Sequence, residues 1–491
     1  MPSVKHPASQ IRMINDAQVI DAALSAAEGR LRLYQHLLKV IIGVGLFGSS
    51  SIMVLAPVLV DPQIAAEATI SADALVLGNS ATFCGWAVGS VVAGGLSDKF
   101  GRKLVVVASG FLGSIGVLSS AFALNGATLV AGRALAGLSL GGTVGQGYVL
   151  AYESLSRARS AALSTDLNIL WVWTVALIAL LHAQALPWRI EQAALGAFVG
   201  IAALLLSALA VESPTYLTLS GRRDKALAAI SRIGAISNAG QELAELKPTL
   251  AMWSKQGAST SIGKSLTSAD DFIGEVRSEL LGPRLKRSTI SMCFAYLSLT
   301  FGYYAISFSA GALSDALLFN FVCLAALDVP GYMLAAKLVA RYGALLSAFA
   351  GLGSTGILLL GTAALAQLHI SPALVTAAAF TAKLAAATTF CVLYDLPVQL
   401  FPERVRGSAT GLAQSSAHFG GLLSPLVVAY LPLAVANSLC SAMCLAAAFT
   451  LSLMLWPRSR AAWGAYAKLT SLTASGSSRN WPNVRWPWRR A

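Results

Sequence analysis

The sequence predicts an all-α membrane protein, with twelve transmembrane helices in two six-helix halves and both termini in the cytoplasm. Three observations predict it: the composition, the number of long apolar runs and the positions of the basic residues. The chain has 491 residues, of which 56% are hydrophobic and 12% charged, and its mean hydropathy is +0.67. Soluble domains carry about 25% charged residues, so this composition indicates a protein of the lipid bilayer.

The apolar runs give the order of the helices. A transmembrane helix needs about 20 apolar residues, and twelve such runs begin near His36, Ala72, Leu104, Ala127, Ser160, Ile190, Ser288, Asp315, Ala344, Ser371, Ser408 and Ala434. They fall six and six around a polar stretch. We therefore divide the chain into a cytoplasmic segment, a first half, a cytoplasmic loop, a second half and a basic tail: 1–35, 36–211, 212–287, 288–456 and 457–491.

The basic residues orient these spans. With both termini inside, 32 of the 35 Lys and Arg residues fall in cytoplasmic segments; Arg133 and Lys383 lie within spans, and Arg189 lies outside. Cytoplasmic loops of membrane proteins carry such an excess of Lys and Arg. The net charge of +13 therefore reflects orientation and not nucleic-acid binding. We expect a monomeric multi-pass protein of the plasma (inner) membrane.

The polar segments have patterns of their own. The loop at 212–287 contains DKALAAISRI and FIGEVRSELL, which predict short amphipathic helices below the bundle, separated by a linker, KQGASTSIGKSLTSADD. The tail alternates tryptophan and arginine, a pattern typical of contact with lipid headgroups. The polar first 35 residues give no sign of a cleavable signal peptide.

No cofactor, metal site or enzyme centre is predicted. All six cysteines fall inside apolar runs, which favours buried, reduced thiols. No cluster of paired acids with histidine marks a catalytic site near the membrane interface.

A charged loop, GGLSDKFGRK at 94–103, joins the second and third spans. Its glycine pair, Gly94 and Gly95, allows close helix packing, and its acid can pair with a base or a helix N-terminus. The basic pair holds the loop on the cytoplasmic side. The residues expected to form this loop's contacts are Gly95, Asp98, Gly101, Arg102 and Lys103.

Together with three further strings, this loop resembles the major facilitator superfamily, within it the sugar porter and organic-ion branch. These strings are GRALAGLSLGG at 132–142, ESPTYL at 212–217 and LFPERVRGSATGL at 400–412. The resemblance implies two rocking halves with a solute site at the bilayer midplane. It also implies cytoplasmic gating charges, among which we place Glu153, Glu212 and Arg406. Arg133 matches the motif of span 4, in the outer half of that span, where it either packs against neighbouring polar groups or contacts the solute.

The chain departs from the branch at several positions. In the second-half loop KLVARYGALL, alanine and leucine replace the acid and the basic pair, and Gln399 replaces a glutamate after span 10. The expected arginine after span 4 is displaced, with Arg157 and Arg159 close by. Span 7 lacks the paired glutamines of sugar-transporting relatives, which argues against hexose.

Charges within the spans are the candidates for solute binding and coupling. Lys383 in span 10 can bind an anionic group, and Asp328 in span 8 can carry a proton or hold Lys383 in the empty state; a fixed structural ion pair is the alternative. Asp166 in span 5 either titrates during transport or pairs with a cytoplasmic base. Asp395 is expected to be an interfacial gate residue, and His418 either titrates or is a hydrogen-bonded helix residue.

Aromatic residues at predicted cavity positions can stack on sugar rings or organic cations. They are Trp171, Trp173, Tyr303, Tyr304 and Tyr394.

These observations predict a secondary active transporter of a small polar organic solute, sugar-like or an organic ion, working by alternating access and coupled to protons. Span 1 contains no acid, so coupling would depend on Asp166, Asp328 or the region of Glu153, or be absent, with facilitated diffusion as the alternative to symport. An inorganic phosphate or anion transporter, and a non-transporting sensor on the same fold, remain alternatives.

Overall fold

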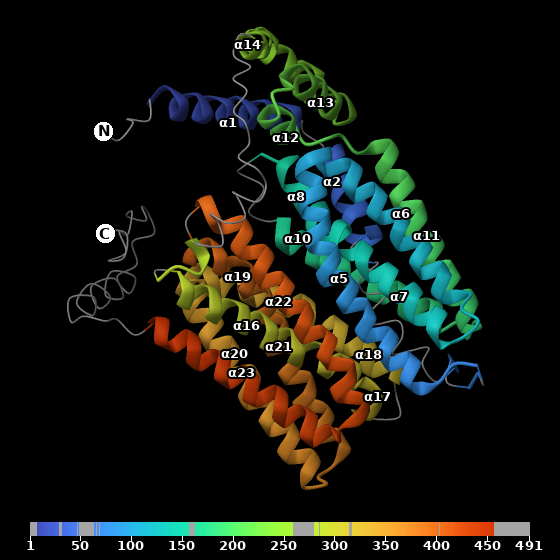
Figure 1. The fold of residues 1–491 in the computed structure, drawn as a ribbon. Helices are drawn as coiled ribbons and strands as arrows, with labels where there is room; N and C mark the ends of the chain where they lie inside the picture. Colours follow the sequence, from blue (N-terminus) through green and yellow to red (C-terminus); the bar gives the residue numbers. More distant parts are fainter. Residues whose placement is uncertain are drawn as a thin grey trace, which may run out of the picture.

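The structure is a computed structural model of the whole chain. It describes these ranges: 7–28, 32–46, 48, 63–64, 66–67, 69–156, 163–258, 279–283, 285–313, 317–401 and 403–455. In these ranges the side chains of 7–15, 17, 46, 164–165, 247, 251–252, 254–258, 398 and 403–408 are left out. Within them the secondary structure is helical throughout (Figure 1). Much of the predicted linker and the whole basic tail lie outside the described residues.

The first half begins with α2 (Leu33–Val40), which continues into the π-helical turn η1 (Ile41–Leu46). Its other helices are α5 (Ala72–Phe100), α6 (Arg102–Ala121), α7 (Gly126–Leu140), η2 (Gly141–Gln146), α8 (Gly147–Glu153), α10 (Leu163–His182) and α11 (Trp188–Leu209). Ser71 begins α5 and Asn125 begins α7 by accepting hydrogen bonds from backbone N–H groups of the first turn, as good N-cap residues do.

The second half contains α16 (Lys286–Phe308), α17 (Ala310–Leu313), α18 (Leu317–Ala326), α19 (Asp328–Tyr342), α20 (Ala344–Gln367), α21 (Pro372–Leu400), α22 (Glu403–Tyr430) and α23 (Leu433–Leu455). Its helices pair as those of the first half do. The α5–α7, α6–α7 and α6–α11 contacts of the first half recur as α19–α21, α20–α21 and α20–α23. The two halves are therefore built on the same packing plan.

The two halves meet along two seams. Helix α5 packs against α22, and α10 packs against α18 and α19 (Figure 1). Each seam joins a helix of one half to helices of the other, so relative motion of the halves must change these contacts.

The predicted cytoplasmic side carries four further helices: α1 (Pro7–Ala27), α12 (Pro214–Leu219), α13 (Arg223–Ile236) and α14 (Gly240–Ala258). They stack at the end of the first half, at the top of Figure 1. The helix expected over DKALAAISRI is confirmed as α13, whereas most of FIGEVRSELL lies outside the described residues. Helix α1 was not predicted: it packs on α13 and α14 with Ile20, Ala23 and Leu24 buried.

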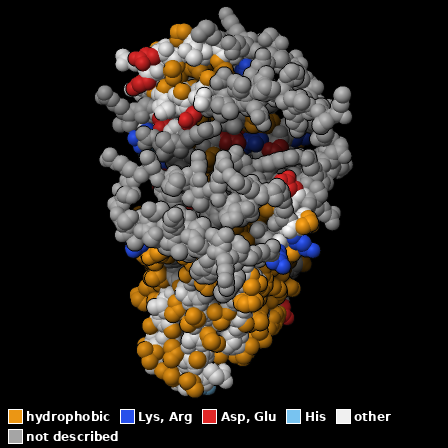
Figure 2. Space-filling model, turned by 90° about the vertical axis from the view of Figure 1, so that its left-hand side faces the viewer, with side chains coloured by type: hydrophobic (Ala, Val, Ile, Leu, Met, Phe, Trp, Pro, Cys, Tyr) orange, Lys and Arg blue, Asp and Glu red, His pale blue; other side chains and the backbone are white. Residues whose placement is uncertain are grey.

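Within the described residues, nine helices are long and apolar enough to cross a membrane. The remaining predicted spans coincide with the shorter apolar helices Leu33–Gly45 and Asp166–His182 and with the more polar α22. The count of twelve spans and the segment boundaries stay predictions. Figure 2 shows one face whose lower part carries mainly hydrophobic side chains between uncharged ones, whereas most of the Lys, Arg, Asp and Glu side chains in view lie above, as expected of a membrane protein.

Two expectations about packing are wrong. A Cβ built on Gly95 meets nothing within 4 Å, and one on Gly94 meets only Gln146, at 3.9 Å, so the close helix approach is elsewhere. It lies nearer the middle of α5, where a Cβ on Gly89 would be 2.0 Å from the Leu138 carbonyl oxygen. Cys84 is exposed and not buried, because it lies on the outward face of the same helix.

Candidate solute-binding site

The centre of the second half holds a buried ion pair. Lys383 on α21 and Asp328 on α19 place Nζ 3.6 Å from Oδ1, and the two residues are 2% and 3% exposed. A charge within the bilayer costs several kcal/mol unless it is paired or hydrated. The two charges that the sequence analysis singled out are thus brought together.

Local sequence explains why Asp328 lies where it does. Pro330 has no N–H to donate to the Ala326 carbonyl, and span 8 breaks into α18 and α19 just before Asp328. The carboxylate therefore lies at a helix N-terminus, where the helix dipole favours negative charge. A Cβ on Gly331 would be 3.1 Å from Ala387 Cβ, so α19 and α21 approach closely enough for the pair to form.

Helix α16 supplies the rest of this cluster. The Tyr303 hydroxyl donates a 2.7 Å hydrogen bond to Asp328 Oδ2, and Lys383 Nζ donates one of 3.0 Å to Ser307 Oγ. The ammonium also lies 3.2 Å from the centroid of the Tyr303 ring, a cation–π contact. Tyr303 thus contacts both charges at once.

An aromatic chain leads from the ion pair to the other half. The Tyr303 ring packs on Tyr304 and Phe390, with centroids 5.2 and 5.4 Å apart, and Phe390 packs edge-on against Tyr394. Tyr304 in turn meets Phe83 of α5 at 4.8 Å. A solute entering between the halves would therefore meet aromatic faces before it reached the charges.

The halves are closed on their predicted outer side. Tyr430 donates to Asp73 at 2.6 Å, Ser80 donates to the Leu422 carbonyl at 3.0 Å, and a Cβ on Gly421 would sit 2.3 Å from the Phe83 ring. Deeper in the bundle Trp86 stacks on His418, with centroids 4.4 Å apart. Among the described residues, all these α5–α22 contacts lie in the outer half of α5.

At the predicted cytoplasmic end of the first half, Arg102 lies at the centre of a charge cluster. It pairs with Asp98 at 3.1 Å and with Glu153 at 3.3 Å. Its guanidinium also lies over the Tyr216 ring, 4.7 Å from the centroid. The loop residues predicted to form gating contacts are thus joined to the end of α8 and to α12.

Glu212 caps the helix that follows the charged loop. One of its carboxylate oxygens accepts hydrogen bonds from the backbone N–H groups of Arg102 and Lys103, at 2.9 and 3.1 Å. Gly101 makes this possible, because its φ of +106° suits glycine and a Cβ there would be 2.2 Å from Glu212.

Gln399 makes the corresponding cap in the second half without a charge. Its side-chain oxygen accepts hydrogen bonds from the N–H groups of Ala344 and Leu345, at 3.0 and 3.3 Å, at the start of α20. The amide thus retains the capping geometry that a glutamate would have. The Arg406 side chain lies outside the described residues.

Other predicted site residues lie apart from the central pair. Asp166 pairs with Lys39 at 2.7 Å, the structural alternative considered for it. Arg133 is 1% exposed and donates to Asn79 on α5. Trp171 is buried with no hydrogen-bond partner for its indole N–H. Arg157 and Arg159 lie outside the described residues.

Trp173 and Asp395, predicted at a cavity and at a gate, are both exposed. Trp173 is 65% exposed, so its prediction as a cavity residue is wrong: it lies on the opposite side of α10 from Trp171. Asp395 is exposed near the cytoplasmic end of α21. Its role at a gate stays a prediction.

The structure also brings together residues that the sequence analysis missed. Glu67 accepts hydrogen bonds from Arg189 at 2.7 Å and from the Trp188 indole at 2.6 Å, and Arg189 donates to the Ala121 and Ala123 carbonyls. The Arg189 guanidinium lowers the pKa of Glu67 below its ordinary value. In the sequence, Arg189 is the one basic residue predicted to lie on the outer side, and this exception could have drawn attention to the pair.

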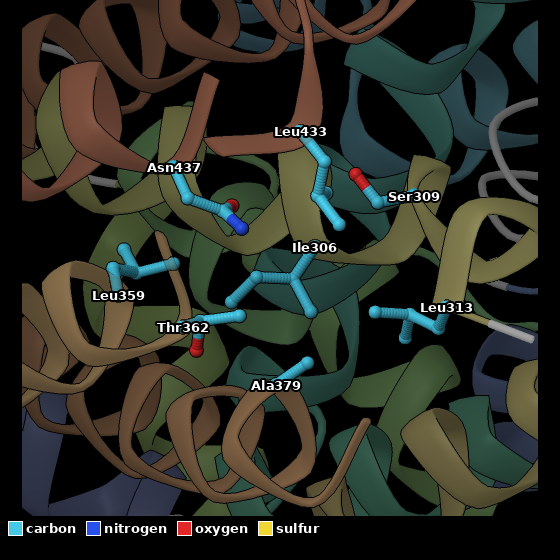
Figure 3. A pocket seen from close by; sticks show the side chains of 8 residues that line it. All are labelled: Ile306, Ser309, Leu313, Leu359, Thr362, Ala379, Leu433 and Asn437. Atoms are coloured by element: carbon cyan, nitrogen blue, oxygen red, sulfur yellow. The ribbon is translucent and has the colours of Figure 1, made fainter. Parts of the chain in front are cut away.

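A small cavity lies elsewhere in the second half. Its volume is about 10 Å³, and side chains of α16, α17, α20, α21 and α23 line it, among them Ile306, Thr362 and Asn437 (Figure 3). A space of this size holds one water molecule at most. It is too small for an organic solute.

Comparison with known proteins places this architecture. The model of the Major Facilitator Superfamily matches residues 41–425. The organic cation/carnitine transporter 7 of Arabidopsis thaliana is 27% identical over 408 residues, 75% of this chain and 80% of that protein. The niacin transporter NiaP of Acinetobacter baylyi is 26% identical over 367 residues, 72% and 77% of the two chains.

Solved structures agree on the fold. The xylose transporter XylE from E. coli, in a partially occluded inward open conformation, superimposes with a TM-score of 0.63. The alignment covers 85% of this chain and 96% of XylE at 15% sequence identity. With its family model matched over most of its length, this multi-pass membrane chain is a transporter and not an enzyme, and it belongs to the Major Facilitator Superfamily.

Proposed function

We propose that this protein is a secondary active transporter of a small organic ion, and that the solute binds beside Lys383 and Asp328. The observation that carries the proposal is the buried pair itself, held at 3.6 Å and lined by aromatic rings. Charges buried in membrane spans commonly mark solute and ion pathways.

An organic ion accounts for the site better than a neutral sugar does. The cluster around Tyr303 offers an ammonium and a carboxylate, and a charged solute can form an ion pair with one of them, whereas a neutral sugar cannot. The relatives named for organic cations, carnitine and niacin point the same way. The likeness to a xylose transporter is one of fold alone.

Alternating access would follow from the two seams. The outer contacts from Asp73 to Trp86 close the predicted outer side, so we propose that the site opens towards the cytoplasm from this state. Rocking of the halves about the central site would separate α5 from α22 and expose the site outside. The charge cluster at Arg102 and the neutral cap at Gln399 lie at the ends of the helices that would have to move together.

Proton coupling is part of the proposal. Asp328 is the acid of the central pair, and its carboxylate accepts a hydrogen bond from Tyr303. Asp166 is engaged by Lys39 instead. We further propose that the protein acts as a monomer in the cell's plasma membrane.

The test is uptake by purified protein in proteoliposomes of labelled niacin, carnitine, a quaternary ammonium and xylose, with and without an inward proton gradient. Lys383→Ala and Asp328→Asn are compared with matched controls, Lys337→Ala and Asp224→Asn, at exposed positions. We expect the wild type to take up one ionic solute. Uptake should fall at least tenfold in Lys383→Ala and Asp328→Asn and be retained in the two control variants. Binding without flux under any gradient would instead identify a sensor.

A further inference from the structure

The central ion pair is incompletely satisfied. Asp328 Oδ1 accepts no hydrogen bond, and Lys383 uses one of its three ammonium protons in a hydrogen bond, to Ser307. The 3.6 Å between Nζ and Oδ1 is longer than a hydrogen bond. A purely structural buried pair gains its stability from close geometry and full hydrogen bonding, and this pair has neither.

A third buried polar group near the ion pair also lacks a good hydrogen bond. The Tyr332 hydroxyl is fully buried beside the Tyr303 side chain, with no hydrogen bond of good geometry. It lies four residues after Asp328 on α19, hence on the same face of the helix. Lys383 and Tyr332 thus offer unused donors beside an unused acceptor, which suits an incoming oxygen anion.

Charge balance then limits what can bind. An anion at Lys383 leaves Asp328 as an uncompensated charge in the bilayer interior, at a cost of several kcal/mol. A proton on Asp328 removes that cost. A lone organic cation at Asp328 would leave the Lys383 ammonium unpaired in the same way.

Resting on the transport function proposed above, we infer that the solute is an organic monocarboxylate whose carboxylate replaces Asp328 beside Lys383 while Asp328 takes up one proton. The solute brings one negative charge and the proton one positive charge, so each transport step moves no net charge. On release, the proton leaves Asp328 with the solute and the Lys383–Asp328 pair re-forms.

The groups around Asp328 leave no nearer carboxylate for that proton. Helix α16 presents Tyr303 and Tyr304, α19 presents Tyr332, and α21 presents Lys383, Cys391 and Tyr394. Asp395 lies twelve residues beyond Lys383 on α21, roughly 18 Å along the helix. Across the seam His418 is stacked on Trp86.

The experiment uses nicotinate and nicotinamide, which differ only in carboxylate against neutral amide. Uptake into proteoliposomes is measured under a proton gradient at zero membrane potential and, separately, under a potential set by potassium and valinomycin without a proton gradient. Protein-free liposomes give the background. Nicotinate exchange, with label on one side and unlabelled solute on both, reports binding and translocation without net proton movement.

We expect nicotinate uptake at least tenfold above nicotinamide uptake, driven by the proton gradient and unaffected by the potential. Asp328→Asn should keep nicotinate exchange within a few-fold of the wild type but lose acceleration by the proton gradient. Lys383→Ala should lose both nicotinate exchange and gradient-driven uptake, whereas Lys337→Ala should retain both. Tyr332→Phe should raise the nicotinate concentration that gives half-maximal uptake several-fold.

Three results would overturn the inference: equal uptake of the amide, uptake driven by the membrane potential, or gradient-driven uptake that survives in Asp328→Asn. Transport of the quaternary ammonium or xylose without nicotinate would also overturn it while leaving the transport function intact. Absence of flux for every solute in the panel would instead count against the transport function.

Discussion

At the scale of single residues, the two charges of the central pair depend on one another. Removing one partner of a buried pair leaves the other uncompensated, at a cost of about 3–5 kcal/mol, whereas removing both can be nearly neutral. We therefore expect Lys383→Ala to lower the unfolding temperature in detergent more than the double variant Lys383→Ala with Asp328→Asn. Equal losses in single and double variants would show that the two charges do not interact.

The external pair of Glu67 and Arg189 gives a prediction about pH. The pKa of Glu67 is lowered in the folded protein by Arg189, so its stabilising effect is present above the ordinary value of 4.5 and is lost as the pH falls below it. The wild type should therefore be more stable than Glu67→Gln at pH 7, by about 1 kcal/mol or less, and the difference should shrink towards pH 4. Thermal unfolding of both proteins at a series of pH values checks this, and a constant difference would contradict it.

The sequence identified Lys383 and Asp328 because charges are rare in apolar helices. It left open whether they meet, since that depends on the break before Asp328 and the close approach at Gly331. The sequence likewise could not predict that Gln399 caps a helix or that Arg133 pairs with Asn79. Both require contacts between residues 54 or 55 positions apart in the chain, and one sequence alone gives no information on such pairs.

At the scale of helices, close packing depends on glycines at defined positions. A Cβ on Gly137 of α7 would be 2.0 Å from the Thr82 carbonyl oxygen on α5, whereas one on Gly361 of α20 would meet nothing within 4 Å. Gly137→Ala should therefore destabilise the protein by about 1–3 kcal/mol, and Gly361→Ala should not. Unfolding temperatures of the two variants test this. An unchanged Gly137→Ala variant would show that α5 and α7 can separate without cost.

Most helices were predictable because long apolar runs have few alternatives in a bilayer. Helix α1 was not, because polar residues interrupt its apolar ones, so that it contains no long apolar run. It is fixed instead by long-range contacts: Asp16 accepts hydrogen bonds from Arg223 of α13 and the Trp253 indole of α14, each at 2.8 Å. The family motifs marked the loops correctly but not the distance between glycines and their neighbours, as Gly95 shows.

At the scale of the whole molecule, closure of the outer side depends on a tight fit between the halves. Gly421 of α22 leaves no room for a side chain beside the Phe83 ring of α5. Gly421→Leu should therefore keep the outer side open and slow transport at least tenfold. In a cysteine-free background, Ser80→Cys should be protected from a membrane-impermeant maleimide and become reactive once Gly421→Leu is added.

Alanine is a useful companion substitution at the same position, because it adds the smallest side chain. Gly421→Ala should give an intermediate labelling rate if the Phe83 ring can shift. Labelling of Ser80→Cys that is equally fast with and without the Gly421→Leu substitution would contradict the assignment of this contact to outer closure.

The family follows from motifs spread over the whole sequence and is confirmed. The orientation and the segment boundaries, which the sequence predicts from basic residues and apolar runs, stay predictions. The identity of the solute does not follow from the sequence, because it is determined by a few side chains that come into contact only in the folded structure. The central claim is that the Lys383–Asp328 pair is the place where a transported organic ion binds.

The most direct test is counterflow: proteoliposomes loaded with unlabelled nicotinate are diluted into labelled nicotinate, with no ion gradient present. We expect transient accumulation of label in the wild type and in Lys337→Ala, and none in Lys383→Ala that is reconstituted as a folded protein. Equal accumulation in Lys383→Ala and the wild type would contradict it.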